Sequence, residues 1–344
     1  MLEDRHGDGR REVARLHRLG LNHPALKMDI VPVTAQTLAA LSPARSFTSF
    51  TTPVSSLAFT DDSQFLLASN DTNSLQVFDV TAGTQVCTAE DFTQDITLVC
   101  ATHHHHALLY ANAQGSEPTV TYFNWKLQQC IWRTTEPTRR IVQICMSPAT
   151  DAFLCISADA NLQLFDLRQR RSIYRHRIEN VYGNCAAAFD PTGTIFAVGA
   201  ADPLNSVIRL WDFRTLQAGP YSTKVWPGGI PVTSFEFSDD GKLALMCTSD
   251  CKVTLLDAFS LAIQRTFQLD AGLGATAKAV FSACSKFIAC GVSSNNGVEL
   301  FETATGQQVH RLEGSGGVRA LGWNKDYLML AVGGETVDLW LPNS

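Results

Sequence analysis

The chain has 344 residues, 45% of them hydrophobic and 17% charged, and its 27 basic and 33 acidic side chains give a net charge of −6. This composition is typical of a globular protein with a large core. Because acidic side chains outnumber basic ones, the chain has no net positive charge that would attract nucleic acid. No apolar run reaches the roughly 18 residues that a transmembrane helix needs.

The N-terminus and the cysteines indicate where the protein is located. The N-terminus is charged and has no apolar segment, so we expect no secretion signal. The ten cysteines occur singly, without a Cys-x-x-Cys pair. In a chain of this size, that pattern predicts reduced, buried thiols in a cytosolic or nuclear protein.

Residues 1–33 belong to no repeat and are expected to form a mobile N-terminal extension. Between Arg5 and Arg18, many basic residues stand among scattered Leu and Val. This favours a mobile or marginally helical tail, and a partner-binding basic helix is the alternative. Met28 is an alternative start to Met1.

From residue 34 onward the chain repeats. The first strand of the repeating unit ends at seven positions that are 42 to 48 residues apart. These positions are Phe59, Ala101, Met146, Phe189, Phe237, Phe281 and Trp323. A period of roughly 40–45 residues is the spacing of the four-stranded blades of WD40 propellers.

The third strand of the unit repeats independently, with apolar residues alternating and a polar residue usually at the end. Its seven copies are Leu75–Asp79, Val120–Asn124, Leu162–Asp166, Ile208–Asp212, Val253–Asp257, Val298–Glu302 and Val337–Leu341. Such alternation fits strands packed between neighbouring blades. Two phased series of seven predict an all-β fold, a seven-bladed WD40 β-propeller over residues 34–344.

Blade four shows the unit most clearly. Its first turn is Asp190-Pro-Thr-Gly193. Pro presets φ at the second position of this turn, and Gly can adopt the backbone conformation that the last position needs. Its third strand ends in the Trp211-Asp212 dipeptide typical of propeller blades.

The last blade has only three strands of its own, ending at Trp340-Leu-Pro342. We expect its fourth strand to come from the segment before blade one, with Arg45–Phe50 as the donor. Pairing both ends of the chain in one blade closes the ring and removes open edges.

Blade two carries four consecutive histidines, His103–His106, in its first turn. Adjacent ligands on a tight turn point in different directions, and no cysteine or carboxylate nearby in the sequence completes a set. We therefore interpret the run as a solvated turn and predict no metal.

Blade three is the most basic. Arg139 and Arg140 precede its first strand, and Arg168, Arg170, Arg171, Arg175 and Arg177 follow its third. We expect the pair on the face that presents the loops between second and third strands, where guanidinium forks can bind phosphate. A solvated basic rim is the alternative. The second group is interpreted as charge that protects an edge strand.

The search for catalytic motifs is negative. The sequence has no GxxxxGK phosphate loop, no G-x-S-x-G elbow and no HExxH helix. The glycine-rich segments 272–274 and 314–317 lie between blades. We therefore predict a binding platform with no enzymatic activity and no cofactor.

Several blade sequences resemble those of one eukaryotic family, the small WD-repeat subunit of the Swd-two or WD-repeat eighty-two type. The segments that carry the resemblance are Arg139–Pro148, Leu164–Arg168, Phe189–Ala197, Leu210–Pro220, Phe237–Leu243, Leu256–Phe259 and Trp340–Pro342. This subunit is shared by the COMPASS histone lysine methyltransferase and by cleavage–polyadenylation and termination assemblies.

The resemblance implies a non-catalytic adaptor, nuclear and chromatin-associated. Its expected partners are a SET-domain methyltransferase complex, protein phosphatase type one with its nuclear targeting scaffold, and the phosphorylated C-terminal repeat of RNA polymerase II. Arg139 and Arg140 match a basic pair of the family. A ubiquitin-ligase substrate receptor and an RNA-processing factor that contacts RNA are the alternatives.

The candidate partner-binding residues are polar side chains that precede first strands or lie in loops between second and third strands. They are Arg139, Arg140, Asp71, Asn73, Asp159, Asn161, Asn205 and Asp250.

Overall fold

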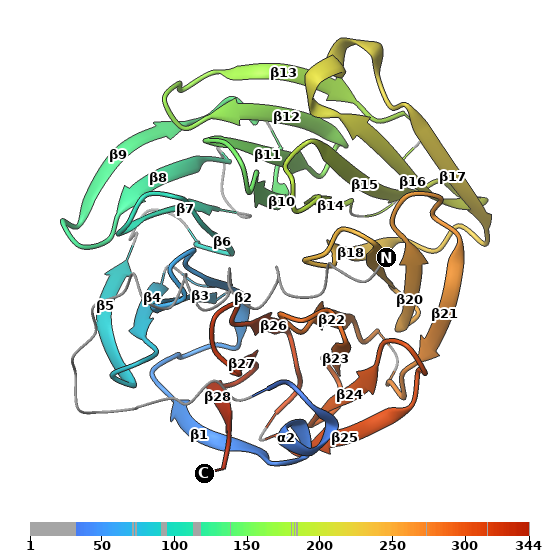
Figure 1. The fold of residues 1–344 in the computed structure, drawn as a ribbon. Helices are drawn as coiled ribbons and strands as arrows, with labels where there is room; N and C mark the ends of the chain where they lie inside the picture. The colour runs from blue at the N-terminus through green and yellow to red at the C-terminus, as the bar shows by residue number, and fades with distance from the viewer. Residues whose placement is uncertain are drawn as a thin grey trace, which may run out of the picture. The chain divides into compact units, whose positions relative to one another are not determined.

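The computed structural model describes residues 32–343, apart from residues 71, 73, 91–94, 113–117, 138, 180, 182, 184, 273 and 315. The predicted extension, with Met28, lies outside the described residues except for Pro32 and Val33. In the described part, seven four-stranded sheets follow one another around a central axis (Figure 1). The prediction of a seven-bladed propeller is confirmed.

Each blade begins with a strand at the centre of the ring, and these strands end at the seven predicted residues. They are β2 Val54–Phe59, β6 Leu98–Ala101, β10 Ile141–Met146, β14 Ala186–Phe189, β18 Val232–Phe237, β22 Ala277–Phe281 and β26 Ala320–Trp323. The second strands are β3 Phe65–Asn70, β7 Ala107–Ala111, β11 Ala152–Ser157, β15 Ile195–Ala201, β19 Leu243–Thr248, β23 Phe287–Val292 and β27 Leu330–Gly333.

The third strands contain all seven predicted segments, extended by up to three residues. They are β4 Ser74–Asp79, β8 Val120–Asn124, β12 Asn161–Asp166, β16 Asn205–Asp212, β20 Lys252–Asp257, β24 Val298–Glu302 and β28 Val337–Pro342. The outer strands are β5 Thr84–Glu90, β9 Gln129–Thr134, β13 Ser172–Arg177, β17 Ser222–Pro227, β21 Ile263–Gln268, β25 Gln308–Leu312 and, in the last blade, β1 Leu41–Phe47.

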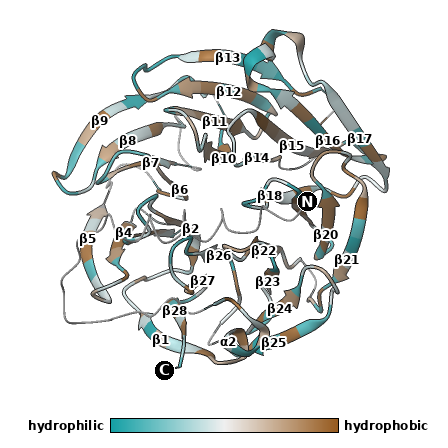
Figure 2. Ribbon diagram, viewed as in Figure 1, coloured by the Kyte–Doolittle hydropathy of each residue, from teal (hydrophilic) through white to brown (hydrophobic). Residues whose placement is uncertain are grey.

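The hydrophobic core lies between the blades. The described residues form seven buried clusters, each shared by two neighbouring sheets. Second strands such as β3 and β11 are buried along their whole length, whereas half of the residues of the outer strand β13 are exposed. Figure 2 shows this difference as brown second and third strands inside a paler, partly teal rim. A single blade could not cover these faces, so the ring is the folding unit.

The blade-four turn has the predicted chemistry. Asp190 Oδ1 accepts a hydrogen bond from the Ile195 backbone N–H at 2.6 Å, and Gly193 adopts φ of +68°. A Cβ on Gly193 would lie 2.7 Å from the Cβ of Ala149, which belongs to the β10–β11 turn of blade three. Glycine therefore satisfies both the backbone and the close approach of blade three.

The ring closes through β1, which pairs antiparallel with β28 in the last blade. The predicted closure is confirmed, but the predicted donor Arg45–Phe50 is displaced: the strand begins at Leu41 and ends at Phe47. Pro43 made its first half look unlike a strand. Because β1 is an edge strand with a register shift between Pro43 and Arg45, the missing N–H of proline is tolerated.

Within the described residues, two short helices interrupt the all-β pattern. Helix α2, Ala35–Ala39, starts at Thr34, whose hydroxyl accepts the Thr37 N–H while Thr37 reciprocates. Its Leu38 is fully buried beside the last two blades. A 3-10 helix, Phe213–Ala218, joins β16 to β17. No helix in the described ranges has the length and apolar character to span a membrane.

Candidate functional site

Arg139 and Arg140 lie at the start of blade three, where the sequence placed them. The Arg140 carbonyl accepts the Ala158 N–H at 2.7 Å, so the pair stands at the same end of the blade as the β11–β12 turn. Both side chains are exposed. Within the described residues, neither guanidinium has a hydrogen bond or ion pair. Both forks are thus available to an anionic ligand.

The polar residues of the same turn have a local structural role. Ser157 Oγ donates to Asp159 Oδ1 at 2.6 Å, and Asn161 Nδ2 donates to Asp159 Oδ2 at 2.5 Å. The carboxylate thereby closes a tight turn in which Ala160 has φ of +61°. Asp159 and Asn161 stay candidate partner contacts, although their presence is explained by turn formation.

Asp250 and Asn205 are held in the same way in blades five and four. Asp250 accepts from Thr248 Oγ1 at 2.6 Å and pairs with Lys252. The Asn205 N–H donates to Asp202 at 2.7 Å. The remaining candidates, Asp71 and Asn73, lie outside the described residues. The structure thus brings together Arg139, Arg140, Asp159 and Asn161, while Asn205 and Asp250 occupy other blades.

The second arginine group of blade three is more structured than a simple charged edge. Arg168 forms a bidentate pair with Asp166, with Nε–Oδ1 and Nη2–Oδ2 distances of 2.9 and 2.6 Å. Arg175 pairs with Glu136 at 2.9 Å. Arg170 and Arg171 are exposed and, among the described residues, unpaired.

Blade four repeats the Asp-x-Arg pair of blade three. Arg214 contacts Asp212 through the same two atoms, at 2.9 and 2.6 Å. The hydrogen bonds from this guanidinium lower the pKa of Asp212 to about 2. Because the Arg214 side chain keeps 72% of its surface exposed, we interpret the pair as fixing the end of the third strand and not as a reactive site.

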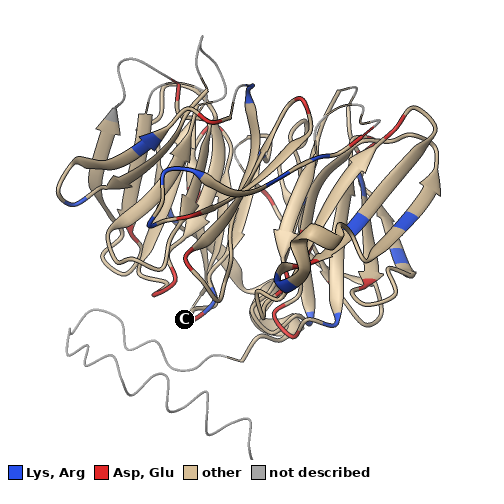
Figure 3. Ribbon diagram, turned by 90° about the horizontal axis from the view of Figure 1, so that it is seen from above, with Lys and Arg blue, Asp and Glu red and all other residues tan. Residues whose placement is uncertain are grey.

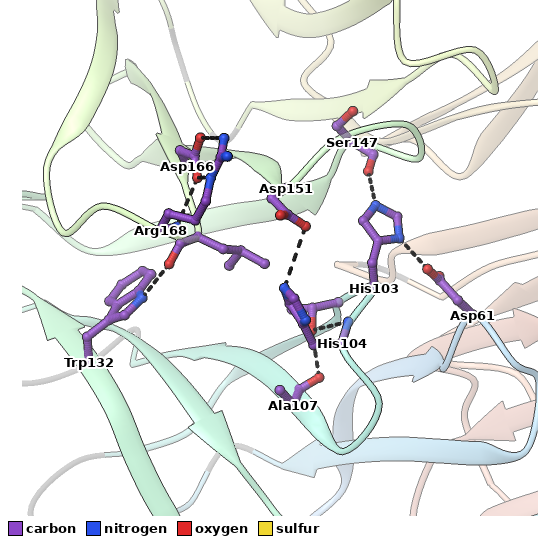
Figure 4. Close-up of polar contacts among 11 residues, drawn as sticks. Asp61, His103, His104, Ala107, Trp132, Ser147, Asp151, Asp166 and Arg168 are labelled. Atoms are coloured by element: carbon purple, nitrogen blue, oxygen red, sulfur yellow. Dashed lines mark hydrogen bonds and ion pairs between the residues drawn. The ribbon is translucent and has the colours of Figure 1, made fainter.

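The four-histidine turn was interpreted from the sequence as solvated, and the structure gives it inter-blade contacts as well (Figure 4). His104 and His105 are exposed, but they face Asp151 at 3.7 Å and Asp62 at 3.0 Å. His103 contacts Asp61 of blade one. The sequence contains a signal for these contacts that was not used. The spacing of the repeats places the three carboxylates in the equivalent turns of the neighbouring blades.

A metal site or a broad basic surface would be another way for the described residues to bind a ligand. Across the described ranges, no group of three or more His, Cys, Asp or Glu side chains is arranged to hold a metal ion. Figure 3 shows basic and acidic residues interspersed over the visible side of the propeller. On this side, the described basic residues therefore form no continuous basic surface. Contacts with an anion are instead expected at single loops, such as that of Arg139 and Arg140.

Seven four-stranded blades closed by an N-terminal strand define the chain as a WD40-repeat β-propeller. The family model of the WD domain, G-beta repeat, matches residues 41–79. These residues include the closing strand and the first three strands of blade one.

Comparison with known proteins narrows the class. The chain is 28% identical over 312 residues to WD repeat-containing protein 82 of Drosophila melanogaster, covering 88% of this chain and 94% of that protein. It is 28% identical over 238 residues to the Set1 complex component swd2 of Schizosaccharomyces pombe, covering 68% and 65%. It is 27% identical over 216 residues to the COMPASS component SWD2 of Saccharomyces cerevisiae, covering 60% and 62%. The predicted resemblance to this group of WD-repeat proteins is confirmed.

Proposed function

We propose that the chain is a non-catalytic scaffold subunit of a nuclear Set1/COMPASS-type histone lysine methyltransferase complex. The observation that carries this proposal is the similarity to two relatives that are named as components of Set1 or COMPASS complexes. The chain is also similar to WD repeat-containing protein 82 over 94% of that protein's length. A propeller supports such a role because its rigid ring holds many loops at fixed positions.

The finer part of the proposal concerns the adaptor's targets. The chain acts at transcribing RNA polymerase II and also serves transcription termination, together with protein phosphatase type one and its nuclear targeting scaffold. It binds the phosphorylated C-terminal repeat of the polymerase through Arg139 and Arg140. Their exposure and lack of partners within the described residues support this role, because a guanidinium donates two parallel hydrogen bonds to phosphate.

Co-purification tests the assignment to a complex. The full chain is purified from nuclear extract at moderate salt, and the proteins that accompany it are identified by mass spectrometry. We expect a SET-domain methyltransferase, a type-one phosphatase with its scaffold, or both. A cullin, or an RNA-processing complex whose retention depends on RNA and salt, would contradict the proposal and favour one of the alternatives.

A matched pair of variants tests the phosphate site. Arg139→Ala/Arg140→Ala removes the free pair before β10, and Arg170→Ala/Arg171→Ala removes the exposed pair between β12 and β13. We expect the first variant to bind a phosphorylated polymerase repeat peptide roughly tenfold or more weakly, since charged hydrogen bonds contribute about 1.5–3 kcal/mol. The second variant should bind normally. Equal losses in both variants, or no loss in the first, would exclude the site.

A further inference from the structure

The first turn of blade two connects three blades through one imidazole. His103 Nδ1 contacts Asp61 Oδ2 in the β2–β3 turn of blade one. Its Nε2 lies 2.8 Å from the Ser147 carbonyl oxygen in the β10–β11 turn of blade three. Figure 4 shows the ring between these two groups, with one nitrogen directed at each.

The two contacts require two hydrogens. An ionised carboxylate and a backbone carbonyl only accept hydrogen bonds, and a neutral imidazole carries a single N–H. Both contacts therefore form together only when His103 is an imidazolium, or when the equivalent proton resides on Asp61. Either way, removal of one proton from the His103–Asp61 pair breaks one of the two contacts.

We propose that His103 is a proton-dependent clasp that fastens blade two to blades one and three. When protonated, it bridges Asp61 and the Ser147 carbonyl, and on deprotonation it releases one neighbour. This role concerns the ring itself and does not depend on the proposed partners.

The charged groups around the turn favour the imidazolium. From blade one, Asp61 and Asp62 face the turn, and from blade three Asp151 does so. The opposing groups are the neighbouring histidines, which repel an imidazolium only when they are themselves protonated, and Lys126, whose Nζ lies 3.4 Å from His106 Nε2. Burial lowers the pKa of His103, but the hydrogen bonds to Asp61 and Ser147 and the charges of Asp61 and Asp151 outweigh it, so the pKa is raised above 6.5.

The sign of the pH effect follows. Because the folded state holds the His103 proton more tightly than the unfolded chain, the stabilisation is fully present below pH 6.5 and is lost as pH rises through the raised folded pKa. Its size is modest, since the His103 and Asp61 side chains keep 28% and 57% of their surface exposed.

The test combines imidazole NMR with thermal unfolding of the full chain from pH 5.5 to 9. We expect both His103 nitrogens to be protonated at pH 6, with a titration midpoint above 6.5. The midpoint should fall by about one pH unit in Asp61→Asn, which keeps an acceptor but removes the charge. The Tm of His103→Gln should be about 1–2 °C below wild type at pH 6 and equal to it at pH 9.

His310→Gln is the control, because the side chain of His310 in β25 has no hydrogen bond or ion pair within the described residues. Its difference from wild type should not vary with pH. Taking differences also cancels the titration of other groups, such as Glu236. A His103 midpoint at or below 6.5, or a Tm difference that is the same at both pH values, would overturn the clasp.

Discussion

At the residue scale, Glu236 breaks the pattern of the central strands. The residue that precedes the end of each first strand is half-buried, and in the other six blades it is small or apolar. Those six are Ala58, Cys100, Cys145, Ala188, Val280 and Gly322. Glu236 keeps some exposed surface but is enclosed by protein. This burial raises its pKa to about 8, and the hydrogen bond from the Phe281 N–H offsets only part of the rise.

Glu236 should therefore make stability depend on pH. Its folded pKa of about 8 lies above the ordinary 4.5, so the folded state binds more protons and stability falls as pH rises between these values. Glu236→Gln mimics the protonated acid. We expect its Tm to match wild type near pH 5 and to exceed it at pH 8.5.

Thermal unfolding at the two pH values checks this prediction. Glu335→Gln, at an exposed glutamate between β27 and β28, is the control and should behave as wild type does. If Glu236→Gln loses as much stability as wild type on going to pH 8.5, the carboxyl is not responsible for the pH dependence.

Which side chains are exposed was easier to predict than which groups they contact. Arg139 and Arg140 stand where the repeat phasing put them, because a loop position follows directly from the strand pattern. To predict the contacts of His103, one would need to know the distance between turns of different blades. No single-blade pattern contains that distance, so the histidine run was interpreted without its neighbours.

At the element scale, close packing between blades relies on glycines in second strands. A Cβ on Gly199 of β15 would lie 2.6 Å from Val232 Cγ1 at the start of β18. A Cβ on Gly291 of β23 would lie 2.5 Å from Val318 Cγ1. Neither glycine has a positive φ, so they are needed for space and not for backbone conformation.

Gly199→Ala should therefore destabilise the protein through overpacking, by about 1–3 kcal/mol. Gly314→Ala is a suitable control, because nothing lies within 4 Å of its added methyl and its φ is not positive. Urea unfolding of both variants measures the difference. Equal stability of the two variants would mean that blade five moves away from β15 without cost.

Strand ends were predictable because seven copies of one unit constrain each other. The first strands end at the predicted residues in all seven blades. The closing strand has no second copy to set its register, and its Pro43 disguises it, so its bounds were wrong. Helix α2 was missed because its five residues are too few to show a helical period.

At the scale of the whole molecule, the ring depends on contacts between distant parts of the chain. Besides the β1–β28 ladder, Ser42 Oγ donates to Asn343 Oδ1 at 2.5 Å. Phe47 stacks on Phe78 of blade one with ring centroids 4.1 Å apart. Leu38 and Leu41 complete the buried cluster between the last two blades. The closing segment therefore supports blades one, six and seven together.

Deleting residues 1–52 should abolish soluble folding, whereas deleting residues 1–27 should leave it intact. The longer deletion exposes the edge of β28 and the apolar faces that Leu38, Leu41 and Phe47 cover, and such an edge favours aggregation. Soluble yield and the cooperativity of thermal unfolding distinguish the two chains. A soluble, cooperatively unfolding product of the longer deletion would show that blade seven is stable with three strands, and that β1 is not required to close the ring.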